Sequence, residues 1–171
     1  MGIREDLEAM DDFYNGEDDG YPPTETLISD VKKFTELAGG TTDQFNVRQT
    51  ALYIGLQLEE MAEKLTAVFG GHSPHIADRL MSVSLGFKEG DFDDAIEACD
   101  AQDLLDADVD LAWVTIGSML SQGADVLGAI GEVTRANMDK FPGGVVTKDC
   151  NGKVKKPQGW KGPDLSGFVC K

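Results

Sequence analysis

The chain has 171 residues, of which 41% are hydrophobic, so it is long enough for one domain with a proper core and short for two. Thirty-one Asp and Glu against fifteen Lys and Arg give a formal net charge of −16, which repels nucleic-acid backbones and anionic membranes. This charge disfavours direct binding to duplex DNA and favours a cation-binding site or a mimic of nucleic acid.

The cysteines and the N-terminal segment favour a cytoplasmic location. Cys99, Cys150 and Cys170 form no CxxC pair and are odd in number, which favours free thiols in a reducing environment. The first twenty residues are acidic and lack the apolar region of a signal peptide. No apolar run approaches the roughly 20 residues that span a bilayer. We therefore expect a cytoplasmic protein without a membrane segment.

Helical periodicity dominates the chain, and no internal repeat is present. Residues 1–22 form an N-terminal extension with apolar residues at helical spacing before NGEDDGYPP. The pattern then predicts four helices at about residues 24–39, 48–69, 101–121 and 125–140. Two shorter helices are predicted between the second and the third of these, one with its N-cap at Ser73 and one with its N-cap at Asp91.

Beyond Pro142 the chain turns basic and rich in Gly and Pro. Residues 142–171 read as a tail laid over the body, and KDCNGKVK within it has the pattern of a small hairpin that turns at Asn151–Gly152. We therefore expect a single all-α domain over residues 1–171, a helical bundle with an irregular C-terminal strap.

The stretch QLEEMAEKL, residues 57–65, places three glutamates inside a long predicted helix. The expected core stripe of this helix has a 4-3-4-3 spacing: Ile54, Leu58, Met61, Leu65 and Val68. Glu60 and Glu63 project from neighbouring positions on another line. Taken alone, this line has two interpretations: a solvated acidic face, or carboxylates that share a cation.

A second acidic cluster favours the cation. DLLDADVDLAWVTIGSML, residues 103–120, aligns Asp103, Asp106, Asp110 and Trp113 on one helical line. Asp110 leads into LAWVTIGSML, which is apolar on nearly every side and is expected to be buried. Because an unpaired charge beside a buried helix is costly, two such helices can share that cost by holding cations between them. Oxygen ligands select Mg²⁺ first and Mn²⁺ second.

Other metal sites do not match the spacing. An EF-hand loop that begins at Asp106 needs Gly and Glu where this chain has Leu111 and Gly117. A di-iron bundle needs ExxH, which neither cluster provides. We interpret His72 and His75 as surface or capping residues, because nothing near them resembles a zinc site.

Four motifs in order resemble a known family. EExxE, DADVDLAWV, EVTRANMDKF and KPQGWKGPDL are similar to segments of the all-α nucleoside triphosphate pyrophosphohydrolases, the MazG-like enzymes. The resemblance covers about residues 30–165 and is closest to the phage-type branch related to phosphoribosyl-ATP pyrophosphohydrolase. It implies the family's all-α fold, cytoplasmic location (the host cytoplasm for a phage product) and Mg²⁺-dependent hydrolysis of a nucleoside triphosphate to the monophosphate and pyrophosphate.

The resemblance also implies roles for individual residues. The implied metal ligands are Glu60, Glu63 and Asp110, and Glu59 is a further ligand or, like Glu63, the base that activates water. In the family's ExxD motif the glutamate lies three residues before the aspartate, and here the residue three before Asp110 is Ala107. Asp106, four residues before Asp110, is therefore the implied replacement for that glutamate.

The later motifs imply contacts to the substrate. Asn137 and Lys140 match N-x-x-K and are expected at phosphate or metal, while Arg135 either assists them or forms an ion pair with Glu132. Of the two tryptophans, Trp160 is the better candidate to stack on a base, and Trp113 is expected in the core.

The family's site lies between helices of two subunits, which implies a homodimer or a dimer-based homotetramer. A purine nucleotide such as (d)GTP, removed in a phage nucleotide-pool pathway, is the first candidate substrate. Two other classes stay open: an acidic helical protein that mimics DNA, and a helical protein that senses nucleotides without cleaving them.

Overall fold

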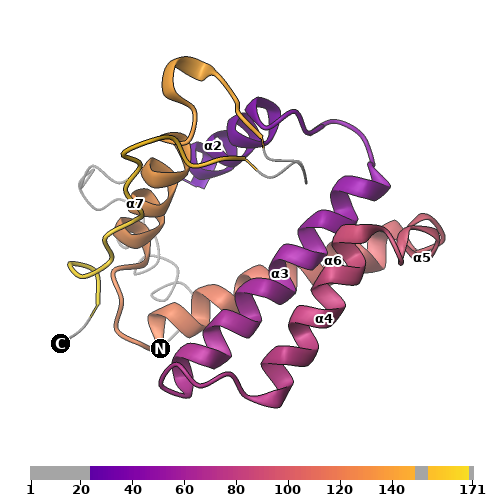
Figure 1. The fold of residues 1–171 in the computed structure, drawn as a ribbon, viewed down its shortest axis with the longest axis horizontal. Coiled ribbons are helices and arrows are strands. Elements are labelled where there is room, and N and C mark those ends of the chain that lie inside the picture. The colour runs from indigo at the N-terminus through magenta and orange to yellow at the C-terminus, as the bar shows by residue number, and fades with distance from the viewer. Residues whose placement is uncertain (1–23, 149–153, 170–171) are drawn as a thin grey trace, which may run out of the picture. The chain divides into compact units, whose positions relative to one another are not determined.

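A computed structural model describes residues 24–148 and 154–169. These residues form six α-helices, α2 (Thr24–Leu37), α3 (Val47–Val68), α4 (His75–Glu89), α5 (Asp93–Glu97), α6 (Ala101–Leu120) and α7 (Val126–Met138), and the short 3₁₀ helix η1 (Pro142–Gly144) (Figure 1). The only β-pairing among them is an isolated antiparallel bridge between Lys148 and Val154. The prediction of an all-α chain is confirmed.

Two of the predicted helix caps are wrong. Helix α4 begins at His75 after Pro74, and the Ser73 hydroxyl donates to the Asp78 carboxylate at 2.6 Å instead of capping the backbone. Helix α5 begins at Asp93, and Phe92 rather than Asp91 precedes it. The bridge at Lys148 lies where the hairpin was predicted, but its Asn151–Gly152 turn, like the N-terminal extension, lies outside the described residues.

Contacts divide the chain into two compact units. One unit is residues 35–116, and the other combines residues 24–34 with the described residues from 117 onward. The divisions fall inside α2 and inside α6, so each of these helices is covalently part of both units. The prediction of one domain for the whole chain stays a prediction.

Helices α3 and α4 of the first unit pack side by side (Figure 1). Small residues form the contact: Ala51, Gly55 and Ala62 on α3, and Ala77 and Ser84 on α4, are all buried. The Ser84 hydroxyl donates to the Gly55 carbonyl at 2.6 Å. A Cβ on Gly55 would lie 2.9 Å from the Ser84 carbonyl oxygen, so only glycine allows this approach.

The expected core stripe of α3 is only partly correct. Ile54, Leu58 and Leu65 are half-buried, but Met61 and Val68 are 39% and 72% exposed, and the fully buried residues of the helix are the small ones, Ala51, Gly55 and Ala62. The 4-3-4-3 spacing identified a helix, but close helix packing selected side chains by size rather than by hydrophobicity.

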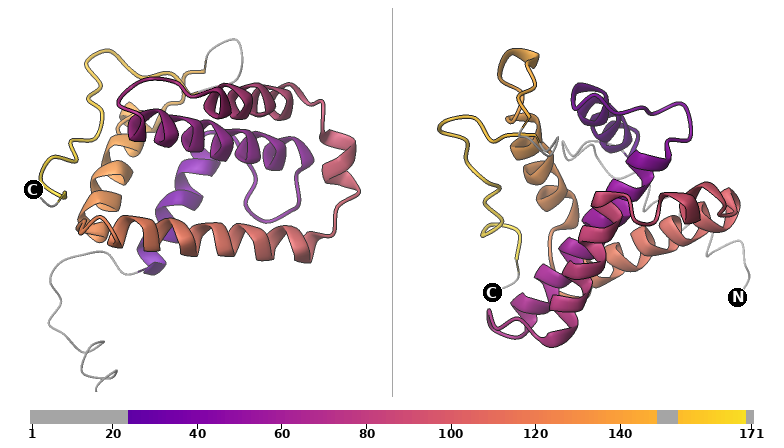
Figure 2. Two further views of the ribbon diagram at one scale, coloured as in Figure 1. Left: turned by 90° about the horizontal axis from the view of Figure 1, so that it is seen from below. Right: turned by 45° about the vertical axis from the view of Figure 1, so that its right-hand side comes forward.

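The expectation that α6 is buried is also wrong. This continuous helix (Figure 2) has no buried residue, although its second half is mostly apolar. Five of its large hydrophobic side chains are between 59% and 78% exposed: Leu105, Val109, Trp113, Val114 and Leu120. Trp113, expected in the core, is the most exposed of them. Asp100 caps the N-terminus of α6, because its carboxylate accepts hydrogen bonds from the backbone N–H groups of Gln102 and Asp103.

In the second unit, the strap (residues 154–169) follows α7 in a regular antiparallel register. Three contacts define the register: Trp160 with Ala136, Asp164 with Glu132, and Phe168 with Gly128. Each step of four residues forward in the strap corresponds to a step of four residues backward in the helix. A fully extended strap would cover more length over four residues than the helix does, because one helical turn rises only about 5.4 Å. Tight turns shorten the strap: the N–H of Trp160 donates to Pro157 O at 3.0 Å, and Gly159 supplies the φ of 80°.

Among the described helices, none combines the length and the apolar composition needed to cross a membrane.

Candidate functional site

The acidic stretches of α3 and α6 belong to the same unit, and a hydrogen bond joins the two helices. The Gln57 side-chain amide donates to the Asp108 carboxylate at 3.1 Å, beside a hollow of about 300 Å³. Because successive helical residues are about 100° apart, Asp106 and Asp110 lie about 200° around α6 from Asp108. Both are exposed, on the side of α6 that does not contact α3.

Glu59 contacts a cation of the chain itself. Its carboxylate forms an ion pair with Lys88 of α4, and both side chains are largely buried, 19% and 24% exposed. The pair spans the same helix contact as Gly55 and Ser84. If Glu59 is a metal ligand or a base, it must therefore act while its carboxylate is paired with Lys88.

Glu60 and Glu63 are both exposed on α3. Glu63 stands at the edge of a hollow of about 420 Å³ between the end of α3 and the start of α4. Small and apolar side chains line the rest of it, including Ala62, Ala67, Ala77 and Met81. A carboxylate beside an apolar hollow is a common arrangement for a small-molecule site.

Within residues 24–148 and 154–169, no three His, Cys, Asp or Glu side chains gather closely enough to hold one metal ion. The structure thus brings Glu60 and Glu63 together on one helix, and Asp106 and Asp110 on another, without joining the four in one cluster of the described chain. The predicted Mg²⁺ site stays a prediction. His72 and His75 are both exposed, which confirms their interpretation as surface residues.

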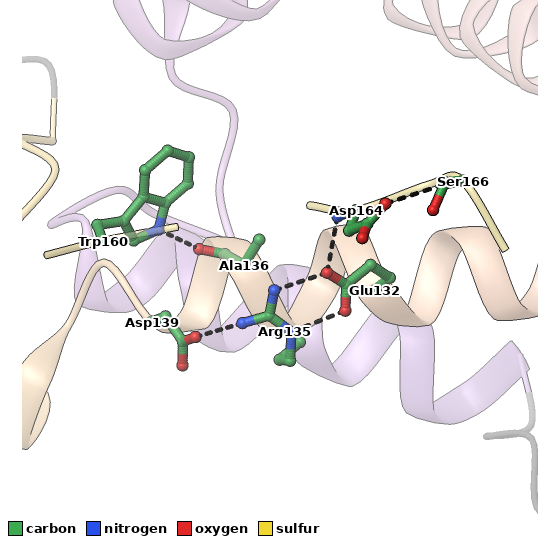
Figure 3. Close-up of polar contacts among 7 residues, drawn as sticks. All are labelled: Glu132, Arg135, Ala136, Asp139, Trp160, Asp164 and Ser166. Carbon is green, nitrogen blue, oxygen red and sulfur yellow. Dashed lines mark hydrogen bonds and ion pairs between the residues drawn. The ribbon is translucent and has the colours of Figure 1, made fainter. Parts of the chain in front are cut away.

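Arg135 of α7 has two ionic partners in its own helix (Figure 3). Its Nε and Nη2 donate to both oxygens of Glu132, at 2.7 and 2.6 Å, and its Nη1 donates to Asp139 at 2.6 Å. Of the two expected roles for Arg135, the ion pair with Glu132 is confirmed. Glu132 also accepts the backbone N–H of Asp164 at 2.9 Å, so the pair holds the strap as well.

These contacts shift the titration of the group. The Arg135 guanidinium, and then the Asp164 N–H, lower the pKa of Glu132 from 4.5 to about 2. Glu132 in turn raises the pKa of Arg135. The Ser166 side chain and backbone lower the pKa of Asp164 (Figure 3). Hydrogen bonds to the ionised forms cause all three shifts.

The N-x-x-K residues contact each other and the strap. Lys140 donates to the Asn137 side-chain oxygen at 2.7 Å, and its Nζ lies 5.5 Å from the centroid of the Trp160 ring. The Trp160 indole N–H donates to Ala136 O at 2.7 Å (Figure 3). The structure therefore brings together three of the predicted substrate-binding residues, and Trp160 is half-buried on α7.

Sequence reasoning missed two residues of this cluster. The Lys156 Nζ lies 4.6 Å from the Trp160 centroid, and Phe34 lies under Lys140 at 5.8 Å and against Phe141 at 5.0 Å. Lys156 begins the KPQGWKGPDL motif, but no role was assigned to it there. Phe34 is more than one hundred residues away from Lys140 along the chain.

Comparison of the chain with known protein families, with curated proteins and with solved structures finds no match.

Proposed function

We propose that this protein is a Mg²⁺-dependent nucleoside triphosphate pyrophosphohydrolase related to the MazG-like enzymes. The observation that carries the proposal is the pair of exposed acidic lines, Glu60 with Glu63 on α3 and Asp106 with Asp110 on α6, in one compact unit. All four carboxylates are exposed to solvent, and their oxygens suit Mg²⁺.

The reaction assigns a task to each group. Water attacks the α-phosphorus, the bond from that phosphorus to the bridging oxygen breaks, and pyrophosphate leaves with the bond's electron pair. Glu63 accepts the proton of the attacking water, because Glu59 is already engaged by Lys88. Glu60, Glu63, Asp106 and Asp110 would hold Mg²⁺, which would supply charge neutralisation and orientation of the phosphates.

The site is shared between two copies in this proposal. Asp108 already contacts Gln57 of its own α3, so Asp106 and Asp110 face away from it. Their helix also exposes apolar side chains, Leu105 and Val109 among them, whose burial against a second copy is favourable. A homodimer, or a tetramer built from dimers, brings one copy's α6 carboxylates to the other copy's Glu60 and Glu63.

The hollow beside Glu63 is the proposed place for the nucleoside. Its volume of about 420 Å³ falls within the range of small-ligand sites, and its apolar lining suits the flat face of a base. We keep (d)GTP as the first candidate substrate.

The test incubates the full chain with Mg²⁺ and each of the eight common nucleoside triphosphates, and follows pyrophosphate. Turnover of at least one nucleotide, abolished by EDTA, is expected. Binding of a nucleotide without turnover would instead indicate the nucleotide sensor, and binding of neither nucleotide nor metal would favour the acidic DNA mimic.

The shared site has its own test. Glu63→Gln and Asp110→Asn are each expected to be inactive, but a mixture of the two, after subunit exchange, should regain activity at about a quarter of the sites. A mixture that stays inactive, although the subunits demonstrably exchange, would place both residues in a site within one copy.

A further inference from the structure

The two tryptophans of the chain have opposite surroundings. The Trp160 indole N–H donates to Ala136 O at 2.7 Å, and the Nζ atoms of Lys140 and Lys156 lie 5.5 and 4.6 Å from the centroid of its ring. Trp113 on α6 is 78% exposed, more than any other large hydrophobic side chain in the described part of the chain. Its ring makes no hydrogen bond, ring pair or cation contact with a described residue. Trp113 is therefore the tryptophan whose ring is accessible to a ligand.

The position of Trp113 on α6 lies between two kinds of exposed side chain. At about 100° per residue, and with Leu105 taken as the origin, Val109 falls at about 40° and Trp113 at about 80° around the helix. Asp106 and Asp110 follow at about 100° and 140°. All five side chains are exposed. Trp113 therefore has apolar side chains on one side and carboxylates on the other.

Trp113 also lies on the helical turn next to Asp110. It follows Asp110 by three residues, which is a rise of about 4.5 Å along the helix axis. Long side chains of a helix point back toward its N-terminus, so we expect the indole to lean over the turn that carries Asp110. A flat aromatic group that is joined to phosphates bound at Asp106 and Asp110 could then reach the ring. The base of a nucleotide is such a group, and bases stack on aromatic side chains.

We propose that Trp113 is the residue on which the base of the bound nucleoside triphosphate stacks, a role for which the sequence favoured Trp160. This inference rests on the proposed function for the nucleotide and for the place of its phosphates. In the shared site, the hollow beside Glu63 of one copy and Trp113 of the other copy would enclose the base between them. The alternative is that Trp113 only adds to the apolar surface of α6, with Leu105 and Val109, that a second copy covers.

The test compares the binding of two probes to the full chain with Mg²⁺. One is the α,β-methylene analogue of a nucleoside triphosphate, which has a base but cannot be hydrolysed at the bond that the proposed reaction breaks. It is chosen as the tightest binder among the analogues of the eight common nucleotides. The other is inorganic tripolyphosphate, which has no base. The readout is the ratio of the two dissociation constants, because a loss of fold or of subunit contact weakens both probes alike.

In Trp113→Ala the preference for the analogue over tripolyphosphate should fall about tenfold, within the range that stacking of one base provides. Trp113→Phe, which keeps an aromatic ring, should retain most of the preference. Leu105→Ala is the matched control, because Leu105 is 64% exposed on the same helix and its truncation removes apolar area without removing a ring. Its preference should equal that of the wild type.

Three results would overturn the proposal. The first is an unchanged preference in Trp113→Ala. The second is an equal loss of preference in Trp113→Ala and Leu105→Ala, which would assign the effect to the apolar surface as a whole. The third is that the wild type binds none of the eight analogues.

Fluorescence assigns the contact to one tryptophan. Because the chain has two, Trp160→Phe leaves Trp113 as the only source of indole emission, and Trp113→Phe leaves Trp160. The analogue should quench the emission of Trp160→Phe, since stacking on a base quenches an indole, and should leave the emission of Trp113→Phe unchanged. The reverse pattern would transfer the role to Trp160 and refute the inference.

The outcomes distinguish this contact from the proposed reaction. A preference for the analogue that depends on Trp113, in a protein that releases no pyrophosphate from any nucleotide, would refute the proposed function and keep the contact. Release of pyrophosphate with the same KM in wild type and Trp113→Ala would keep the function and refute the contact.

Discussion

The carboxylate helices α3 and α6 and the α7–strap pair use charged side chains in opposite ways. Glu60, Glu63 and Asp110 are exposed to solvent. Around α7, by contrast, Glu132 and Arg135 bind each other and the strap. Charge around α7 holds the strap to its helix, whereas in the proposed function these three carboxylates serve a bound metal. Substitution of the charged residues named here should therefore affect activity in the first region and stability in the second.

The largest expected effect is on turnover. Glu60→Gln, Glu63→Gln and Asp110→Asn should each lower kcat at least about 100-fold, because several kcal/mol of charge stabilisation depend on the metal that they hold. Circular dichroism should stay unchanged, since these residues are exposed. Asp108→Asn is the matched control: it keeps an oxygen for Gln57 and lies on the opposite side of α6. Loss of activity in the control as well would show a general charge effect.

The second effect is on the α3–α4 contact. Gly55→Ala places a Cβ 2.9 Å from the Ser84 carbonyl oxygen, a backbone atom that can move only with its helix. We expect a loss of about 1–3 kcal/mol in the free energy of unfolding, as for overpacked cores. Gly117→Ala, whose Cβ has open space in α6, serves as the control in chemical denaturation. Equal stability of the two variants would contradict the close packing.

A smaller effect should distinguish two glycines of α7. Gly131→Ala meets no neighbour and should stabilise the helix by roughly 0.5–1 kcal/mol. Gly128→Ala would bring a Cβ to 2.4 Å from the carboxylate of Asp125, the N-cap of α7, and to 2.5 Å from the Phe168 ring, so it should disturb the cap, displace the strap end and lose that gain. Thermal melting of both variants measures the difference. If Gly128→Ala stabilises as much as Gly131→Ala, neither close contact forms.

The smallest effect is a pH dependence of strap docking. Because the folded-state pKa of Glu132 is lowered from 4.5 to about 2, its contribution is fully present above pH 4.5 and is lost as the pH falls toward 2. The NMR signal of the Trp160 indole N–H should follow this loss. In Glu132→Gln the signal should no longer respond to pH over that window, and an identical response in both proteins would assign the change to another group.

Much of the fold was predictable, because helical spacing and breakers act locally. Helix α3 was predicted from about residue 48 to 69 and runs from Val47 to Val68. The burial of its faces was not, because Ala51, Gly55 and Ala62 are too small to stand out in a hydrophobic pattern. The burial of α6 was predicted wrongly from its apolar second half. Hydrophobicity indicates that a surface favours being covered, but it does not identify the surface that covers it.

The candidate site was predictable to the same extent. Residues on one helix, such as Glu60 with Glu63 or Asn137 with Lys140, share a face because of their spacing. The ion pair of Glu59 with Lys88, and the place of Lys140 on Trp160, depend on how separate segments pack. A single sequence carries no local signal for either contact.

The most direct test of the proposed chemistry is hydrolysis in ¹⁸O-labelled water with Mg²⁺ and the best nucleotide substrate, with both products analysed by mass spectrometry. Attack at the α-phosphorus predicts pyrophosphate as the leaving product and the label in the nucleoside monophosphate. Orthophosphate with nucleoside diphosphate, or label in the pyrophosphate, would contradict the account, because the water would then have attacked another phosphorus.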